Sequence, residues 1–536
     1  MLGTLLVALV FLLTGCLRHE PRADLVIING AEPESLDPAI ITGQPDLRVV
    51  GTLFEGLTRY DARTGGPEPG LAESWETSDD RRVYTFNLRT NAVWSTGEPI
   101  TAEDVAYSWL RVLNPETAAE YVGQLYFLKN AEAFNSGKIT APSLVGVRAL
   151  DPHTLRVELH SPIPFFLSLC AHPTLAVVPR QAIEQHGDRW LSVRPLPVSG
   201  AYELEAWRLN DKLRFRRNPR YWDAAHTRSE VVDVLPITSP STALNLYDTD
   251  RADIVWDKTL MPNELLDVLL KRRDFHTFDY IGSYFVRFNM TRQPFTDVRV
   301  RRALAMAVDR KRITEKILKG GERPATHHTP DGVANYHPPD GLSHDPEQAR
   351  RLLSEAGFPG GQGFPTFVYL FNATAGGGSK PDAKIAVELQ DMWKTELGIH
   401  GELRQMEWKV YLATQRALNY DVCRSSWIGD YNDANTFLDM FMSNNGNNRT
   451  GWKDPRYDAL IRDANQQTEV RAREELLRQA ETLLIRDAVV IIPLYFYAGI
   501  FAFDPDKIEG VHTNILDEHP IRAISKKKGQ SVVNGQ

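Results

Sequence analysis

The chain has 536 residues, of which 42% are hydrophobic and 24% are charged, and its 61 Lys and Arg against 69 Asp and Glu give a net charge of −8. This length predicts several domains or two large lobes, and the apolar content excludes a disordered chain. A mildly acidic chain without a basic tract argues against nucleic-acid binding, which depends on neutralising phosphates. The only long apolar run is at the N-terminus, which excludes a polytopic membrane protein.

The N-terminus predicts export. Residues 2–15 are uncharged and mostly apolar, which is too short for a membrane-spanning helix and typical of a secretory signal. The sequence Leu13-Thr14-Gly15-Cys16 that ends this run resembles a bacterial lipobox. The resemblance implies cleavage before Cys16, a lipid anchor on that cysteine, and a location in the periplasm or on the outer face of the cell membrane. The alternative is an ordinary signal peptide that contains a cysteine.

After the signal, the chain predicts alternating strands and helices. Thr101 and Asp104 have the spacing of a capping box, in which each side chain satisfies a backbone N–H at a helix start. Further patterns predict strands at 25–28, 84–88 and 489–492, helices at 297–310 and 469–487, and loops at 64–70, 329–341 and 358–365. This mixture without a repeating βαβ period predicts an α/β fold of two mixed lobes.

A search for catalytic and metal-binding motifs finds no HExxH, GxSxG, paired CxxC or Walker sequence. We interpret His327-His328 as part of a surface loop, because adjacent side chains point apart and no acidic or cysteine cluster lies nearby in the sequence. Cys170 and Cys423 are expected to be buried free thiols, with a disulfide between them as the alternative. We therefore predict a protein that is not an enzyme and has no cofactor or resident metal.

Seven short strings, in order along the chain, carry a resemblance to a family. They are 34–38 (ESLDP), 53–57 (LFEGL), 69–75 (PGLAESW), 94–99 (WSTGEP), 218–222 (NPRYW), 294–301 (PFTDVRVR) and 352–357 (LLSEAG). Together they resemble the peptide-binding proteins of bacterial ABC importers. The resemblance implies a monomeric, two-lobed binding-protein fold with an additional subdomain and mixed sheets joined by a hinge. It also implies short peptides as ligands, and a membrane permease with its ATPase as partners.

The resemblance also implies a division of the chain. It predicts a signal at 1–15, an anchored linker at 16–24, a first lobe, a subdomain, a second lobe and a tail at 526–536. The first lobe takes 25–54, 179–281 and 498–525, the subdomain 55–178, and the second lobe 282–497. Hinge crossings are expected near 281 and 497.

Residues 424–432 (RSSWIGDYN), with Trp408 before them, resemble the oligopeptide-binding branch. By this resemblance Asp430 holds the peptide's α-ammonium and Arg424 lies toward its carboxylate. Physics favours both roles, because charge-assisted hydrogen bonds to the two termini are available to every peptide. Residues between them can add the peptide as a strand. The predicted ligand-binding set is Asp430, Arg424, Ser425, Ser426, Trp427, Ile428, Trp408, Tyr497 and Asp382. The alternatives are a turn cap for Asp430, an internal ion pair for Arg424 and core positions for the aromatic residues.

The chain departs from this branch at the carboxylate end. Asp382 stands where a histidine is expected, and Leu318, followed by Lys319, stands where a lysine is expected. Either Arg424 is the main carboxylate anchor, which favours a narrow range of peptide lengths, or Asp382 recognises a cationic or amidated group, as in a cell-wall peptide.

Other functions stay open at this point. Within the same family, the ligand could be a murein peptide or a metal chelate. A secreted hydrolase would use Asp430 with Asp382 or Glu407 as acid and base. A surface lipoprotein without a ligand is the remaining alternative.

Overall fold

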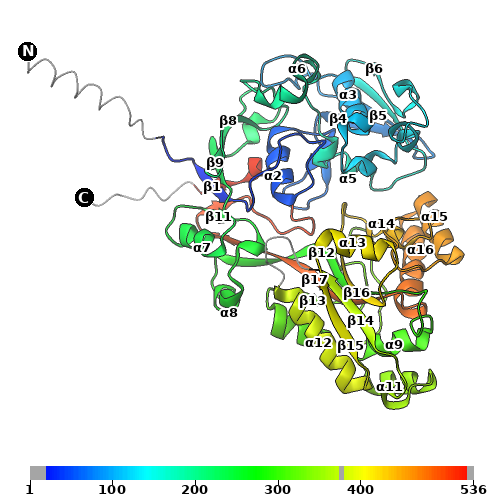
Figure 1. Ribbon diagram of the computed structural model, residues 1–536. Coiled ribbons are helices and arrows are strands. Elements are labelled where there is room, and N and C mark those ends of the chain that lie inside the picture. The colour runs from blue at the N-terminus through cyan, green and yellow to red at the C-terminus, as the bar shows by residue number, and fades with distance from the viewer. Residues whose placement is uncertain (1–19, 373–379, 528–536) are drawn as a thin grey trace, which may run out of the picture.

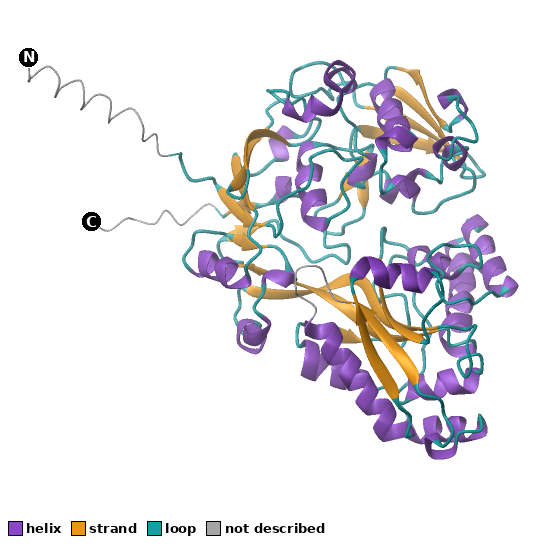
Figure 2. Ribbon diagram, viewed as in Figure 1, coloured by secondary structure: helices purple, strands orange, loops and turns teal. Residues whose placement is uncertain are grey.

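The computed structural model describes residues 20–372 and 380–527 and has two lobes (Figures 1 and 2). We call them, from their places in Figure 1, the upper lobe (β1 to β10, 25–235) and the lower lobe (α9 to α16, 298–482). This confirms the predicted two-lobed α/β fold. Within the described ranges, no helix is long and apolar enough to cross a membrane.

An eleven-stranded mixed sheet runs through both lobes. Ten strands follow in the order β15-β14-β16-β12-β17-β11-β1-β10-β9-β8, and β13 pairs with β17. Pairing is parallel between β1 and both β10 and β11, and between β14 and both β15 and β16; the other pairs are antiparallel. The bounds are β1 (Leu25–Ile28), β8 (Tyr202–Arg208), β9 (Lys212–Arg217), β10 (Val231–Leu235), β11 (Ile254–Val255), β12 (Phe275–Phe288), β13 (Arg323–Pro324), β14 (Phe367–Asn372), β15 (Gly401–Met406), β16 (Val422–Ile428) and β17 (Ile491–Phe503).

The upper lobe contains a second, antiparallel sheet in the order β4-β5-β7-β6. The predicted capping box starts α3, where the Thr101 N–H donates to the Asp104 carboxylate at 2.8 Å. One expectation is wrong: the predicted loop at 64–70 contains β3, because this segment pairs with β2. Elements here and beside the crossing strands are β2 (Thr58–Tyr60), β3 (Pro67–Pro69), β4 (Ala72–Thr77), β5 (Val83–Leu88), β6 (Val147–Asp151), β7 (Thr154–Glu158), α2 (Gln44–Leu53), α3 (Ala102–Leu113), α4 (Ala131–Asn135), α5 (Phe166–Leu169), α6 (Arg180–His186), α7 (Pro240–Asp248) and α8 (Leu266–Leu269).

Helices cover the sheet in the lower lobe. The helix predicted at 297–310 ends at Met306, because the Asp309 carboxylate caps a new short helix by accepting from the Arg312 N–H at 3.2 Å. The helix predicted at 469–487 is confirmed as α16 and a following π-helical turn. The helices are α9 (Val298–Met306), α10 (Arg310–Arg312), α11 (Pro346–Glu355), α12 (Lys380–Leu397), α13 (Trp408–Arg416), α14 (Asn435–Leu438), α15 (Pro455–Gln466) and α16 (Val470–Thr482).

Strands β12 and β17 connect the two lobes. Their ladder pairs 275–279 with 498–502 and 283–287 with 491–496, and its register shifts between Asp279 and Ser283. The strand predicted at 489–492 begins at Ile491 as part of β17. The shift in the ladder lies at the two positions, 281 and 497, where the sequence predicts a hinge; the hinge motion and the division into segments stay predictions.

The histidine pair is placed differently from the expectation. His328 is fully buried, and its ring packs edge-on against Phe285, Phe437 and Phe441. The surface-loop interpretation is therefore wrong for His328, since aromatic rings from distant parts of the chain enclose it. Cys170 and Cys423 are buried free thiols, as predicted.

Candidate functional site

Strand β16 has one open edge. It pairs with β12 from Val422 to Ile428, whereas on its other side β14 pairs only with Val422 and Cys423. In the described part of the chain, residues 424–428 therefore have no strand partner on that side. This edge lies on the lower lobe between α13 and the crossing strands (Figure 1).

Three hydrogen bonds show which backbone groups of β16 point to this edge. The Gly429 N–H donates to the Ile281 carbonyl at 2.7 Å, toward β12. On the opposite side, the Arg424 carbonyl accepts from the Tyr411 hydroxyl and from Gln415 Nε2 at 3.2 Å. Because successive residues of a strand direct their backbone groups to alternate sides, the N–H and C=O groups of Ser426 and Ile428 point to the open edge. The N–H and C=O groups of Ser425 and Trp427 point toward β12.

Arg424, on β16, is a buried cation with only loose compensation. Its guanidinium lies 5.0 Å from the Tyr284 ring centroid, and its Nε is 3.8 Å from the nearest Asp382 oxygen. Asp382, in the first turn of α12, accepts a hydrogen bond from the Tyr284 hydroxyl at 3.0 Å. Among the described residues, Arg424 Nε has no hydrogen-bond partner. Arg424 thus has a long ion pair with Asp382, and its Nε–H remains available as a hydrogen-bond donor.

Aromatic rings from β12 and β17 lie near Arg424, whose guanidinium is beside the Tyr284 ring. Tyr284 stacks on Tyr495 with ring centroids 4.7 Å apart, and Tyr497 meets Tyr495 at 5.4 Å. Gly282 lets Ile428 and Tyr497 approach β12 closely, because a Cβ there would lie 2.5 Å from Ile428 Cδ1 and 2.8 Å from Tyr497 Cδ2. Tyr497 and Ile428 are therefore close neighbours over Gly282.

Asp430 follows β16 by two residues and faces the upper lobe. Its backbone N–H donates to Thr436 Oγ1 at 3.2 Å. Within the described chain, its carboxylate has no hydrogen bond or ion pair, and burial raises its pKa to about 6. Its charge also contributes to the raised pKa values of Tyr60 and Tyr121, both in the upper lobe. Asp430 is thus a partly buried carboxylate between the lobes, and no described residue pairs with its charge.

Contacts on both sides hold the Asp430 loop. Tyr431 stacks on Phe165 of the upper lobe, with ring centroids 3.8 Å apart and planes at 6°. Asp433 forms a two-pronged ion pair with Arg473 of α16 at 2.7 and 2.8 Å. The loop therefore has a defined position at the junction of the lobes.

The two tryptophans of the predicted set differ in their surroundings. Trp427 is half-buried and its Nε1 donates to Thr436 Oγ1 at 3.4 Å, the same oxygen that accepts from the Asp430 N–H. Trp408 is 40% exposed and stacks on Tyr411, whose hydroxyl donates to the Arg424 carbonyl. Tyr60 and Tyr121, which lie near Asp430 in the upper lobe, were not predicted; Tyr60 follows the 53–57 string closely, whereas Tyr121 has no such sequence signal.

Metal ligands do not gather in the described residues, where no group of three or more His, Cys, Asp or Glu side chains could hold an ion. Of the residues considered for hydrolysis, Asp382 contacts Arg424 rather than Asp430.

The chain is similar to known proteins in both sequence and fold. The model of the family "Bacterial extracellular solute-binding proteins, family 5 Middle" matches residues 66–449. The periplasmic oligopeptide-binding protein OppA of Salmonella typhimurium is 39% identical over 89% of this chain and 88% of its own length. The probable deoxycholate-binding periplasmic protein YgiS of Escherichia coli is 36% identical over 89% of this chain and 88% of its own length.

One solved structure is the unliganded open form of the murein tripeptide-binding protein MppA. It superposes with a TM-score of 0.82 at 35% identity, covering 95% of this chain and 98% of the other. These relatives are named as binding proteins, not as enzymes.

The buried Asp430 carboxylate predicts a pH-dependent stability. Its pKa rises from 3.8 to about 6 on folding, so the stability that it contributes below pH 4 is lost as the pH increases through 6. We expect Asp430→Asn to raise the free energy of unfolding by about 2–3 kcal/mol at pH 7.5 and to have little effect at pH 4, since one pKa unit is worth about 1.4 kcal/mol. Urea unfolding of the ligand-free protein at both pH values measures this.

The matched control is Asp463→Asn, which changes an exposed carboxylate on α15. An equal effect of Asp430→Asn at both pH values would contradict the prediction.

Proposed function

Because this chain belongs to family 5 of the bacterial extracellular solute-binding proteins, we propose that it is an exported binding protein of an ABC importer that takes short peptides in extended form between its two lobes. Its partners would be a membrane permease and the ATPase of that importer. Membership alone does not fix the ligand, since relatives are named for oligopeptides, murein tripeptide and deoxycholate. The ligand class must be argued from the site.

The open edge of β16 is the observation that carries the peptide proposal. Ser426 and Ile428 direct backbone donors and acceptors to an edge that no described strand covers. An extended peptide can pair with such an edge through groups that every peptide has. A steroid or a metal chelate has no matching series of donors and acceptors, so the edge favours a peptide.

The charged groups at the two ends support the same ligand. Asp430 is an uncompensated carboxylate suited to an α-ammonium, and Arg424 is a buried guanidinium with a free donor suited to a carboxylate. Five residues lie between them in the sequence, so their Cα atoms are at most about 20 Å apart at ~3.3 Å per residue. Peptides of about three to five residues would fit once the side chains of Arg424 and Asp430 reach inward.

Asp382 adds a constraint at the carboxylate end. It lies 3.8 Å from Arg424 and therefore repels a carboxylate that approaches the same guanidinium. A free terminal carboxylate would have to loosen this pair, whereas an amidated or cationic group would keep it. The two alternatives from the sequence, an Arg424 anchor or recognition by Asp382, thus predict opposite preferences.

Ligand binding would stabilise a closed form. Asp430 faces Tyr60 and Tyr121 across the junction of the lobes, so a peptide held at Asp430 would contact both lobes. A ligand that binds the closed arrangement better shifts the population toward it. No catalytic step is needed for this role, and incubation with peptide should give no product; product formation would revive the hydrolase alternative.

The ammonium end gives the first test of the function. We expect Asp430→Ala to weaken binding of a tri- to pentapeptide at least about 30-fold, since the loss of one partner of a buried charge pair costs about 2–5 kcal/mol. Acetylation of the peptide's N-terminus should weaken binding to the wild type similarly and add little in the variant. Isothermal titration calorimetry with Asp463→Ala as control measures both effects. Unchanged affinity in Asp430→Ala would overturn the role of Asp430.

The carboxylate end gives a second test. If Arg424 is the anchor, the wild type should bind a free-acid peptide about tenfold tighter than its C-terminal amide, and Arg424→Gln should remove this preference. Arg416→Gln, which changes an exposed arginine at the end of α13, is the control. Tighter binding of the amide by the wild type would contradict the anchor role and favour recognition by Asp382.

The lipid anchor is a separate part of the proposal, and Cys16 lies outside the described residues. We expect wild-type protein, expressed in bacteria with labelled palmitate, to carry the label and to sediment with membranes. Cys16→Ala should lose both properties, whereas Cys170→Ala, a buried thiol, should keep both. An unlabelled wild type would contradict the anchor while leaving the binding function untouched.

A further inference from the structure

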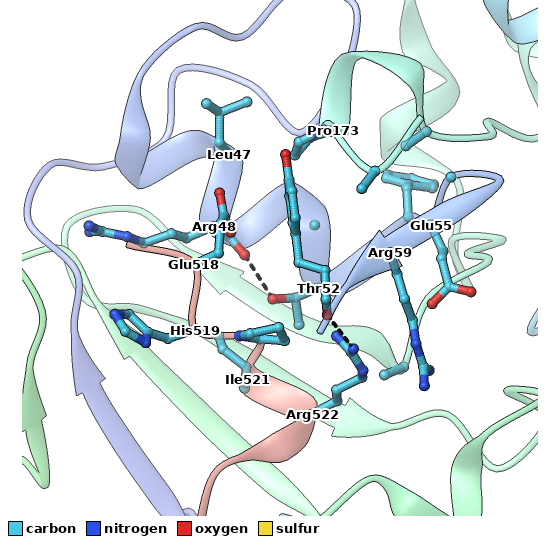
Figure 3. Close-up of a pocket in the computed structure, with 18 of the residues that line it drawn as sticks. Leu47, Arg48, Thr52, Glu55, Arg59, Pro173, Glu518, His519, Ile521 and Arg522 are labelled. Carbon is cyan, nitrogen blue, oxygen red and sulfur yellow. Dashed lines mark hydrogen bonds between the residues drawn. The ribbon is translucent and has the colours of Figure 1, made fainter. Parts of the chain in front are cut away.

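A pocket in the upper lobe lies between α2 and the C-terminal segment 518–522. Figure 3 shows Arg48 and Thr52 of α2 and Glu518 and Arg522 of this segment around the pocket, with Glu518 next to Arg48. The cavity has a volume of about 70 Å³, and Tyr60 also lines it. Such a space exceeds what one water molecule needs and can hold a small cationic head group with its bound water.

Glu518 is held in place but its charge is not matched. Asn514 fixes its backbone, accepting from the Glu518 N–H at 3.1 Å and donating to its carbonyl at 2.7 Å. The Glu518 carboxylate has no hydrogen bond or ion pair with any described residue, and burial raises its pKa to about 7, with Asp517 as a second cause.

The cations around the pocket already have partners. Arg48 forms an ion pair with Asp517 at 3.1 Å, and Arg59 forms one with Glu68 at 2.8 Å. Arg522 lies 3.1 Å from Glu68 and donates to the Tyr60 carbonyl at 2.7 Å. Among the described residues, no cation forms an ion pair with Glu518: Arg48, whose charge lowers the pKa of Glu518, is paired with Asp517.

Tyr60 links this pocket to the proposed peptide site. Besides burial, two charges raise the pKa of its phenol, those of Glu518 and Asp430. Tyr60 also packs against a hydrophobic cluster that includes Leu516, two residues before Glu518, and against which Trp427 of β16 packs as well. The ring therefore contacts a cluster shared by the segment of Glu518 and the strand that leads to Asp430.

We propose that Glu518 is a second cation-binding subsite, which receives the ammonium or guanidinium of a lysine or arginine side chain at the first position of the bound peptide. The proposal rests on the proposed function, in which Asp430 holds the α-ammonium of the same residue. A lysine or arginine extends its charge on a flexible apolar stem, and this stem can lie along the Tyr60 ring while the charge reaches Glu518. A charged ligand group would thereby supply the partner that Glu518 lacks.

The test compares Lys-Ala-Ala with norleucine-Ala-Ala, whose first side chains are similar in length but differ in charge. Calorimetry on the full-length protein should show that the wild type binds the lysine peptide at least about tenfold tighter. Glu518→Gln keeps the shape of the side chain and should reduce this ratio to about one by weakening only the lysine peptide. Glu509→Gln, which removes an exposed carboxylate nine residues before Glu518, should leave the ratio unchanged.

The outcomes separate the two proposals. A wild type that binds both peptides equally, or a Glu518→Gln variant that keeps the preference, overturns the subsite and leaves the peptide-binding function intact. A wild type that binds neither peptide overturns the proposed function and the subsite with it. Thermal melting of each variant identifies any loss of binding that comes from misfolding.

Discussion

The ladder between β12 and β17 is the constraint on which the site depends. These two strands carry one sheet from the lower lobe to the upper, and their register shifts where the lobes meet. There Ile281 bonds outside the β12–β17 ladder, since its N–H donates to the Ile515 carbonyl at 2.8 Å and its carbonyl accepts from Gly429 at 2.7 Å. The end of β16, and Asp430 with it, is therefore fixed at the junction. A change of the angle between the lobes would therefore change the distance from Asp430 to Tyr60, whereas the geometry of β16 would stay nearly the same.

The site keeps several polar groups unmatched in places where burial makes them costly. A buried carboxylate without a partner destabilises the fold, and so does an incompletely bonded guanidinium. Asp430 and Arg424 have these properties at opposite ends of a strand edge whose own backbone groups lack a strand partner. Polar groups that lack a hydrogen-bond or ion-pair partner are expected at functional sites. A ligand with an ammonium, a carboxylate and a peptide backbone would supply partners for Asp430, Arg424 and the strand edge together. A ligand without these groups would supply none of the three partners.

Local patterns were predictable because they depend on neighbouring residues. The strand at 25–28, the alternation at 84–88 and the Thr101–Asp104 capping box follow from side chains within a few positions, and each is present. Contacts between distant segments were not predictable in this way. The burial of His328 depends on Phe285, Phe437 and Phe441, and the pairing of Asp382 with Arg424 depends on how α12 packs beside β16. The family resemblance supplied Asp430 and Arg424, but nothing local marks Glu518, whose relation to Tyr60 arises only when the C-terminal segment returns to α2.

The two ends of the site are not equivalent, and the difference follows from their neighbours. Arg424 already has a carboxylate at 3.8 Å and a tyrosine ring beneath its guanidinium, so a ligand carboxylate would exchange one partner for another. Asp430 has no such partner among the described residues, so a ligand ammonium would add an interaction without displacing one. An added charge pair contributes more than an exchanged one, because only the exchange leaves a displaced group to be solvated. The amino end of the peptide should therefore dominate affinity, and side-chain preferences should be strongest at the first residue, next to Tyr60.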